Sequence, residues 1–363
     1  MNHTFINQHV LSSWLKMLNE QLKGILLKNK ESFTDILGQE PAKQGIKSAL
    51  LMNRHIIIVG APGIGKTTLA KNIAKLLPDI DVNEGCSYNC TPKNPVCPTC
   101  KQKANHKTVK LNGAKRFVRI QGSPDLTVED LLGDIDPIKA LKFGPLSLEA
   151  FTPGKIFKAN NGILFFDELN RCPEKLQNAL LQVLEEGKAT IGSYDVDFDI
   201  DFIFIGTMNP EDTSTEKLSD VLLDRFDMAY MNYPENISVE KKIVEMKGEK
   251  IANVSDEILN LIVYFVRLLR NDEKLEKKPS VRASIGLYER SQSNALLKGR
   301  KNVQFEDVKD VLVSVLSHRI RLKPSVRYLE SIENYIKEQF HKNIESTKWQ
   351  NHLEQEEEPG EYR

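Results

Sequence analysis

The segment that most constrains the fold is an apolar run followed by a glycine-rich loop and a helical pattern. Ile56–Val59 is the apolar run, Gly60–Thr67 reads Gly-Ala-Pro-Gly-Ile-Gly-Lys-Thr, and Leu69–Leu77 repeats apolar residues at helical spacing. Glycines let successive backbone N–H groups turn toward phosphate oxygens, and the N-terminus of the following helix adds partial positive charge. So many specified positions in this setting argue against a tight turn that binds nothing. The sequence therefore predicts a phosphate-binding loop.

The loop and the first helical turn after it are expected to bind ATP together with Mg²⁺. Lys66 would reach the β- and γ-phosphates, and the Thr67 hydroxyl would take one position on Mg²⁺. The expected nucleotide-binding residues here are Gly60, Ala61, Pro62, Gly63, Ile64, Gly65, Lys66, Thr67 and Thr68.

Two further apolar runs lead to polar residues that suit phosphate chemistry. Ile163–Phe166 is followed directly by Asp167 and Glu168. Behind a phosphate loop, Asp167 would hold Mg²⁺, directly or through water, and Glu168 would orient and polarise the attacking water. Phe202–Ile205 comes shortly before Asn209, whose side chain could hydrogen-bond that water or the γ-phosphate. An Asn-Pro pair also commonly starts a turn, and the two interpretations are compatible.

Strand and helix patterns divide the chain into two domains. Strand candidates alternate with helical or irregular stretches from about 33 to 234, which predicts an α/β domain with a parallel sheet covered on both faces. Helical spacing without a β-rich run follows, in Ser238–Ile251, Asp256–Asn271, Val281–Lys298 and Phe305–His318. The expected segments are an N-terminal helical extension (1–32), the α/β domain (33–234), an all-α domain (235–322), a C-terminal helix (323–352) and an acidic tail (353–363).

The α/β domain is expected to carry two insertions and a hairpin. The insertions cover 81–116, which contains cysteines, and 122–153, in which Phe143, Leu146, Leu148 and Phe151 are apolar. Strict alternation in Tyr194–Asp201, after Lys188–Ile191 and a Gly-Ser pair, predicts the hairpin.

Four of the five cysteines lie close together in the first insertion. Their spacing is Cys86-x3-Cys90-x6-Cys97-x2-Cys100, which brings two pairs within reach of one tetrahedral ion. A structural zinc ion is the preferred interpretation. A thiol–disulfide switch and an iron–sulfur cluster stay open as alternatives, because four thiolates suit all three.

Charge and hydropathy argue against several classes of partner. Lys plus Arg (50) balances Asp plus Glu (50), so no net field attracts nucleic acid or a membrane surface. No apolar run of about 18 residues occurs, and the first residues lack the pattern of a secretory signal. The expectation is a cytoplasmic protein with neither a membrane nor a nucleic-acid partner.

Taken together, the motifs resemble those of the AAA+ ATPases. Gly60–Thr67 is similar to Walker A, Phe165–Glu168 to Walker B, and Asn209 to sensor 1. The resemblance implies an α/β P-loop domain followed by an all-α lid domain, and catalysis of ATP hydrolysis to ADP and phosphate.

The resemblance extends to three residues outside these motifs. Leu222–Asp227 is similar to the arginine-finger region, which implies that Arg225 reaches into the neighbouring subunit's site. Pro279–Ser284 resembles sensor 2, which implies that Arg282 lies over the γ-phosphate of its own subunit. Gly38 lies in a segment similar to the one that packs on adenine.

The closer resemblance is to the group of MoxR-type ATPases and the ATPase subunit I of magnesium chelatase, over roughly residues 33–322. The cysteine-containing insertion is similar to the chelatase subunit, whereas Asn170–Leu181 is similar to MoxR-type proteins. The group implies a ring homo-oligomer, a hexamer, that remodels a partner protein with a von Willebrand A-type domain. Magnesium chelatase activity would require partner subunits. The helix-2-type insertion at 122–153 would face the ring's pore, where its apolar residues and the hairpin at 188–201 could grip or push a partner. Burial of those apolar residues against the same subunit stays open as the alternative.

A nucleic-acid-dependent AAA+ motor related to the replicative helicases is the alternative. Such a motor needs a basic channel, and the balanced charge argues against one.

Overall fold

The computed structural model describes residues 17–28, 32–102, 107–145, 147–191, 196–210 and 218–345. The chain forms two compact units, Met1–Ala61 with Gly65–Met231, and Pro62–Ile64 with Asn232–Arg363. The start of the expected N-terminal helix and the acidic tail lie outside the described residues. Among the described residues, no helix is both long and apolar enough to span a bilayer.

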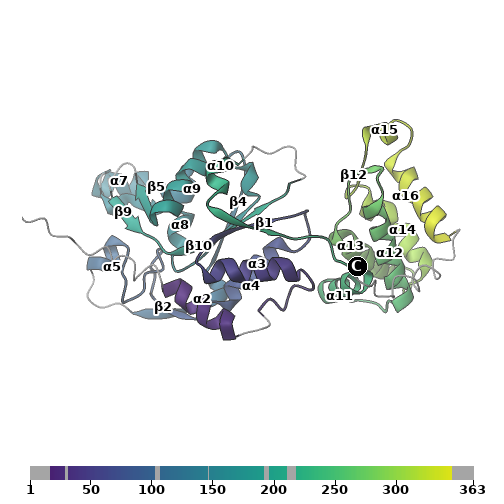
Figure 1. Ribbon diagram of the computed structural model, residues 1–363, viewed down its shortest axis with the longest axis horizontal. Coiled ribbons are helices and arrows are strands. Elements are labelled where there is room, and N and C mark those ends of the chain that lie inside the picture. The colour runs from purple at the N-terminus through teal and green to yellow at the C-terminus, as the bar shows by residue number, and fades with distance from the viewer. Residues whose placement is uncertain are drawn as a thin grey trace, which may run out of the picture. The chain divides into compact units, whose positions relative to one another are not determined.

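A five-stranded parallel sheet forms the middle of the first unit (Figure 1). Its strands are β1 (His55–Val59), β4 (Phe117–Gln121), β7 (Gly162–Asp167), β10 (Phe202–Met208) and β11 (Phe226–Tyr230), in the order β11-β1-β10-β7-β4. All four neighbouring pairs are parallel. β1, β7 and β10 are apolar and buried along almost their whole length, as expected for strands covered on both faces.

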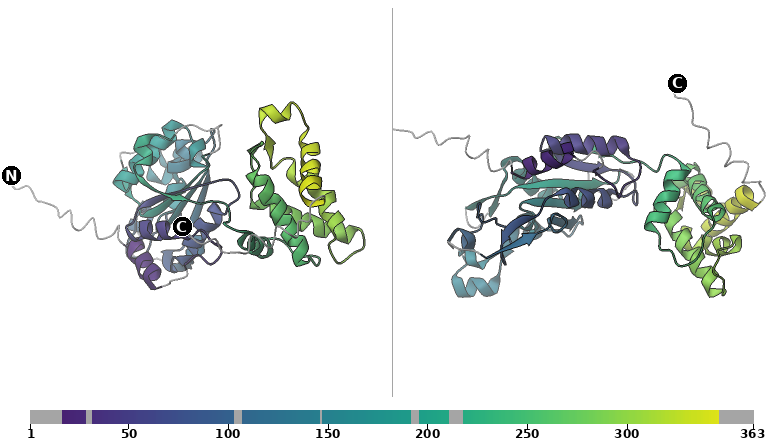
Figure 2. Two further views of the ribbon diagram at one scale, coloured as in Figure 1. Left: turned by 45° about the vertical axis from the view of Figure 1, so that its right-hand side comes forward. Right: turned by 90° about the horizontal axis from the view of Figure 1, so that it is seen from below.

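Helices cover both sides of this sheet. They are α2 (Met17–Lys28), α3 (Glu40–Leu51), α4 (Lys66–Leu76), α8 (Lys155–Lys158), α9 (Glu174–Glu186) and α10 (Asp220–Leu223), with short 3₁₀ turns at Gly113–Lys115, Leu148–Ala150 and Leu169–Arg171. Figures 1 and 2 show α2 on one side of the sheet and α9 and α10 on the other. The α4 helix buries Leu69, Ile73 and their alanine neighbours, which is the apolar face that its sequence periodicity predicts. The predicted sheet between helices is confirmed.

Three antiparallel ribbons extend from this unit. They are β2 (Ile80–Asn83) with β3 (Thr108–Leu111), β5 (Gly133–Ile135) with β6 (Phe151–Pro153), and β8 (Lys188–Ile191) with β9 (Val196–Asp199). The first ribbon frames the cysteine-containing insertion with its short helix α5 (Pro98–Gln102). The second lies in the insertion at 122–153, with α6 (Val128–Leu132) and α7 (Pro137–Phe143). The third confirms the predicted hairpin, whose turn lies outside the described residues.

The apolar residues of the insertion at 122–153 do not share one environment. Phe151 is buried and its ring meets that of Phe157 edge to face, so it is part of the core rather than a group that grips a partner. Phe143 is 44% exposed. Leu146 and the side chain of Leu148 lie outside what the structure describes.

The second unit is mainly helical. Its helices are α11 (Ile237–Lys247), α12 (Asp256–Asn271), α13 (Val281–Leu297), α14 (Phe305–Leu316), α15 (Pro324–Arg327) and α16 (Ile332–Phe340), followed by a π-helical turn at His341–Glu345. A short ribbon of β12 (Leu275–Lys277) and β13 (Arg321–Leu322) adds strands that sequence spacing did not indicate. The expected single helix after residue 323 is interrupted, because Ser331 caps the start of α16.

Candidate functional site

The carboxyl ends of the sheet strands bring the predicted nucleotide-binding motifs together. Val59 pairs with Met208, and Gln121 pairs with Asp167, so these strand ends lie at one edge of the sheet. The Gly60 N–H donates to the Met208 carbonyl at 3.1 Å, which ties the glycine-rich loop to the strand that precedes Asn209. In open parallel sheets this edge is where ligands bind.

The glycine-rich loop ends at Gly65, which precedes α4 with a φ of 102°. Few residues other than glycine adopt this backbone conformation. A Cβ atom on Gly65 would lie 3.4 Å from Ile36 Cδ1, so the segment that contains Gly38 runs beside the loop. Lys66 begins α4, and its ammonium group donates to the carbonyls of Gly60 at 2.5 Å and Ala61 at 2.9 Å. The lysine charge is therefore held within the curve of the loop.

Asp167 ends β7, and both of its carboxylate oxygens are hydrogen-bonded. The Thr207 hydroxyl donates to Oδ1 at 2.7 Å, and Arg119 Nη2 donates to Oδ2 at 2.6 Å. The side chain of Asp167 is 15% exposed, whereas that of Arg119 is 51% exposed. Thr207 thus fixes one oxygen from inside the fold, while the second faces an arginine that solvent also reaches.

Glu168 has a left-handed backbone with a φ of 56°, which is rare for a residue with a side chain. Its N–H donates to the Thr207 hydroxyl at 2.9 Å, and its carboxylate accepts from Gln121 Nε2 at 3.0 Å and pairs with Arg171 at 3.4 Å. A Cβ atom on Gly122 would lie 2.0 Å from the Glu168 carbonyl oxygen, so only glycine fits beside this turn. Backbone strain of this kind is common at functional sites.

Asn209 and Arg225 come from the same unit. Asn209 directly follows β10, and Asn170 Nδ2 donates to its carbonyl at 3.4 Å. Arg225 lies between α10 and β11, and its guanidinium forms an ion pair with Glu185 of α9 and contacts Asp224 at 3.3 Å. The Arg225 side chain is 38% exposed. Arg282 lies in the first turn of α13, in the second unit.

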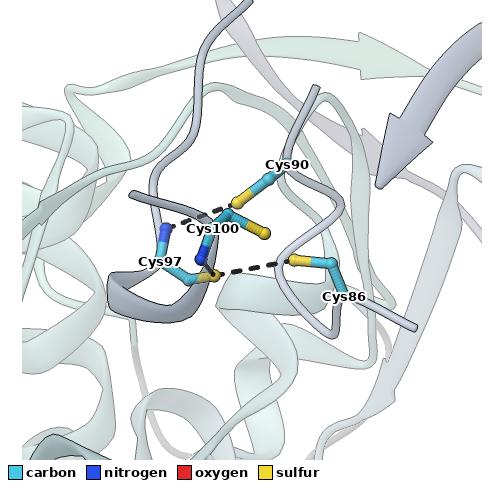
Figure 3. Close-up of side chains that lie close together, drawn as sticks. All are labelled: Cys86, Cys90, Cys97 and Cys100. Carbon is cyan, nitrogen blue, oxygen red and sulfur yellow. Dashed lines mark hydrogen bonds between the residues drawn. The ribbon is translucent and has the colours of Figure 1, made fainter. Parts of the chain in front are cut away.

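The four predicted cysteines converge in the first insertion, with their sulfurs facing one another (Figure 3). All four sulfur atoms lie within 4.8 Å of one another, and those of Cys86 and Cys97 are 3.8 Å apart. The Cys90 sulfur accepts from the N–H groups of Val96 and Cys97 at 3.2 and 3.3 Å. The Cys97 sulfur accepts from the Cys100 N–H at 3.3 Å.

The donor set fits one tetrahedral ion. Zn–S bonds of about 2.3 Å place the sulfurs of a tetrahedron roughly 3.8 Å apart, the separation found between Cys86 and Cys97. A cluster of several irons would spread the thiolates farther, because they bind different iron atoms. Hydrogen bonds with Cys90 and Cys97 lower the pKa of Cys86, and the bonds to Cys86 and Cys90 raise that of Cys97. Without an ion, the cluster therefore favours the thiolate at Cys86 and the protonated thiol at Cys97.

Comparisons with known proteins agree with the motifs. The family model for magnesium chelatase, subunit ChlI, matches residues 32–110, the model for the ATPase family associated with various cellular activities (AAA) matches residues 96–228, and the AAA lid domain matches residues 268–335. The magnesium-chelatase subunit ChlI homolog of Methanocaldococcus jannaschii is 30% identical over 350 residues, covering 86% of this chain and 93% of that protein. The chain belongs to the AAA+ ATPases of the magnesium chelatase subunit I group. It is an ATPase, and chelatase activity in this group needs partner subunits.

This AAA+ protein is also similar to subunits of magnesium chelatase from other organisms. The magnesium-chelatase subunit ChlI of Synechocystis sp. is 29% identical over 337 residues, covering 83% of this chain and 90% of that protein. A solved complex between subunits BchI and BchD of magnesium chelatase contains a chain that is 22% identical, with a TM-score of 0.46, and it covers 82% of this chain and 98% of that chain. The MoxR-like character of Asn170–Leu181 stays a prediction.

Several polar residues of this AAA+ site were not predicted. The Thr207 hydroxyl connects the Asp167 carboxylate to the backbone of Glu168. Arg119 forms an ion pair with Asp167, and Glu185 forms one with Arg225. The sequence could have indicated Arg119 and Gln121, because side chains two positions apart in a strand lie on the same face, and these two polar residues flank the buried Ile120 of β4. No local pattern marks Glu185, which meets Arg225 only through the fold.

Proposed function

We propose that this chain is a ring-forming ATPase motor of the magnesium chelatase subunit I type, assembled as a hexamer, which remodels a partner protein. The observation that carries the proposal is the convergence of the glycine-rich loop, Asp167, Glu168 and the Asn209 segment on one sheet edge. This is the set of groups that phosphoryl transfer to water requires.

Each residue of this edge has a proposed role in ATP hydrolysis. The loop Gly60–Gly65, with Thr68 and Gly38, binds the nucleotide, and Lys66 turns from its loop carbonyls to the β- and γ-phosphates. Thr67 and Asp167 hold Mg²⁺, which when bound offsets phosphate charge. Glu168 orients and polarises the attacking water, and Asn209 hydrogen-bonds that water or the γ-phosphate.

Arg225 is proposed to act on the neighbouring subunit's nucleotide. An exposed ion pair is worth only about 0.2–1 kcal/mol, so exchanging Glu185 for a phosphate costs little. The rigid, always charged guanidinium suits the charge that develops on the γ-phosphate. Arg282 is proposed to contact the γ-phosphate of its own subunit.

The partner is proposed to carry a von Willebrand A-type domain, as the resemblance to chelatase and MoxR-type motors implies. Support comes from the relatives, which are named as subunits of a larger enzyme. The insertion at 122–153 presents Ile138 and Leu141 of α7, which are 80% and 92% exposed. Exposed apolar side chains of this kind suit a contact with another protein.

The four-cysteine cluster is proposed to hold a structural zinc ion. The convergence of four sulfurs at tetrahedral spacing supports zinc over a multi-iron cluster, and the backbone N–H groups that point at two of the sulfurs would stabilise thiolates.

Replacing Glu168 by Gln tests the motor assignment. ATP binding should persist, because Glu168 is not assigned to nucleotide contacts, while turnover should fall by about 10²–10⁴-fold with loss of the base. The exposed Glu174→Gln change on α9 is the matched control and should leave turnover unchanged. Full turnover in Glu168→Gln would remove Glu168 from its role. DNA-stimulated, salt-sensitive turnover of the unaltered protein would favour the nucleic-acid-dependent motor instead.

A further inference from the structure

The loop between Cys86 and Cys90 packs its aromatic residue against the core of the α/β unit. The Tyr88 ring meets Phe157 edge to face at 5.1 Å and stacks on Phe198 at 5.9 Å. Phe157 belongs to α8, and Phe198 belongs to β9 of the hairpin. Helix α8 and strand β9, which are far apart in the sequence, therefore both pack on the Tyr88 side chain, between Cys86 and Cys90 in the sequence.

Hydrogen bonds fix the backbone of the same loop to the segment that leads into β7. The carbonyls of Tyr88 and Asn89 accept from the side chains of Asn160 and Asn161 at 2.9 and 3.1 Å. Asn89 Nδ2 returns a bond to the Lys158 carbonyl at 2.7 Å. Asn160 is buried, so its bonds are protected from exchange with water.

These asparagines also bind the segment that leads into β10. The Asp201 N–H donates to Asn160 Oδ1 at 3.1 Å, and the Asn161 N–H donates to the Asp201 carbonyl at 2.6 Å. Gly162 begins β7 and Phe202 begins β10. The cysteine loop is thus connected to the amino ends of the two strands whose carboxyl ends lead to Asp167 and Asn209.

The loop has little regular structure of its own to hold this position. Between Cys86 and Cys100 it contains one bridge, Thr91 with Asn94, and the start of the five-residue helix α5. Asn89 adopts a left-handed φ of 47°. An irregular segment of this kind loses much conformational entropy when it is ordered, and a bound ion offsets that loss by joining its two ends.

We propose that a metal ion at the four-cysteine cluster fixes the Tyr88–Asn89 loop against the amino ends of β7 and β10. Metal occupancy would then determine how rigidly the two strands that lead to the hydrolytic residues are held. This inference rests on the zinc site proposed above. It does not depend on which partner the motor remodels.

Hydrogen exchange of the full-length protein, with metal and after its removal by a chelator, tests the inference. Metal removal should raise amide exchange at least tenfold in 158–166 and 198–206, the segments tied to the loop. Exchange in α13, which lies in the second unit, should not change. Zinc added back should restore the slow exchange. If zinc leaves and exchange in the two segments stays the same, the inference fails while the zinc site stands.

The zinc site is tested separately by elemental analysis of anaerobically purified protein and by Co²⁺ substitution. We expect about one zinc per chain, and thiolate-to-Co²⁺ absorption that disappears in a Cys97→Ser, Cys100→Ser variant. The Cys172→Ser change, at a buried cysteine outside the cluster, should keep that absorption. Iron–sulfur absorption or a disulfide in the purified protein would overturn the zinc site, and this inference with it. Neither outcome bears on the Glu168→Gln test of the motor.

A variant that leaves every cysteine in place separates packing from metal binding. Tyr88→Ala removes the ring between Phe157 and Phe198, so it should keep bound zinc but raise exchange in 158–166 and 198–206. Tyr230→Ala, at a 64% exposed tyrosine of β11, is the control. Slow exchange in Tyr88→Ala, equal to that of the control, would overturn the proposed connection through the loop.

Discussion

The two ends of β7 and β10 are built in different ways. At the carboxyl ends, the charged groups are partly exposed and ion-paired, and Glu168 has a strained backbone. At the amino ends, Asn160 and Asn161 are buried and hydrogen-bonded to the cysteine loop. Breaking an exposed ion pair costs little free energy, whereas breaking a buried hydrogen bond costs more. One end can therefore exchange its partners during a catalytic cycle, while the other holds the strands in place.

This difference gives an experimental rule. Substitutions at the carboxyl ends should alter turnover and leave the free energy of unfolding nearly unchanged, because the groups there touch solvent. Substitutions at the amino ends should lower stability first, because each leaves a buried polar partner without its hydrogen bond. A residue that obeys the opposite rule would break the comparison.

The largest effect is expected for Arg225→Ala, at an exposed residue that directly precedes β11 and belongs to neither end of β7 or β10. Arginine fingers accelerate phosphoryl transfer by about 10³–10⁵-fold, so ATP turnover should fall by at least about 10³-fold. The melting temperature should barely change, because the lost contact with Glu185 is an exposed pair. Steady-state phosphate release and thermal unfolding measure the two quantities.

Mixed rings test whether Arg225 acts across an interface. Arg225→Ala subunits should restore turnover when they are mixed with Glu168→Gln subunits, since each supplies what its neighbour lacks. Arg54→Ala removes a comparable exposed pair, with Asp227, and should behave like the unaltered protein. Absence of any rescue would place Arg225 outside the neighbouring site.

A smaller effect, on stability, is expected for Asn160→Ala. The change removes the donor to the Tyr88 carbonyl and the acceptor of the Asp201 N–H, and both partners lie in partly buried surroundings. The free energy of unfolding should fall by about 3 kcal/mol, measured by urea denaturation. Asn178→Ala changes an exposed asparagine of α9 and serves as the control. Equal stability of the two variants would contradict a rigid amino end.

Sequence patterns located the carboxyl edge well, because its residues lie in short motifs at the ends of apolar runs. Ile56–Val59, Ile163–Phe166 and Phe202–Ile205 each lie within a strand of the sheet. Strand β11 was not predicted, because its sequence Phe-Asp-Met-Ala-Tyr lacks a continuous apolar run. An edge strand of this kind gives a weak signal.

The amino ends could not be predicted to the same degree. Spacing identified the four cysteines, because metal ligands recur at short intervals. It did not identify Tyr88, Asn160 or Asp201 as their neighbours, since these residues meet only after the insertion packs on the sheet. Contacts between residues about seventy positions apart leave no local periodicity for a single sequence to reveal.

The pH dependence of stability sharpens the description of the amino ends. Burial raises the pKa of Asp201 to about 7, although the Leu18 N–H and Arg116 favour its charge. The folded protein therefore holds this proton more tightly than the unfolded chain, and its contribution to stability is lost as pH rises toward 7. Asp201→Asn keeps a neutral group, so its stability relative to the unaltered protein should rise by about 3 kcal/mol between about pH 5 and pH 8.

Urea unfolding of both proteins across this range measures the difference directly. Burial lowers the pKa of His55 to about 4, but His55 is present in both proteins and its titration cancels. A constant stability difference between Asp201→Asn and the unaltered protein would show that Asp201 is charged in the fold, and that water reaches the amino ends of the strands.

The smallest effect is expected at Gln121, which contacts Glu168 from the neighbouring strand. Its amide donates to the carboxylate that is proposed to orient the attacking water, so Gln121→Ala should lower turnover by roughly tenfold through misorientation. ATP affinity and the free energy of unfolding should not change. In a Glu168→Gln background the same substitution should have no further effect, because the carboxylate that it orients is absent. Additive losses in the double variant would mean that Gln121 acts on the nucleotide itself, and the carboxyl edge would then contain a binding residue on β4 as well as on β1, β7 and β10.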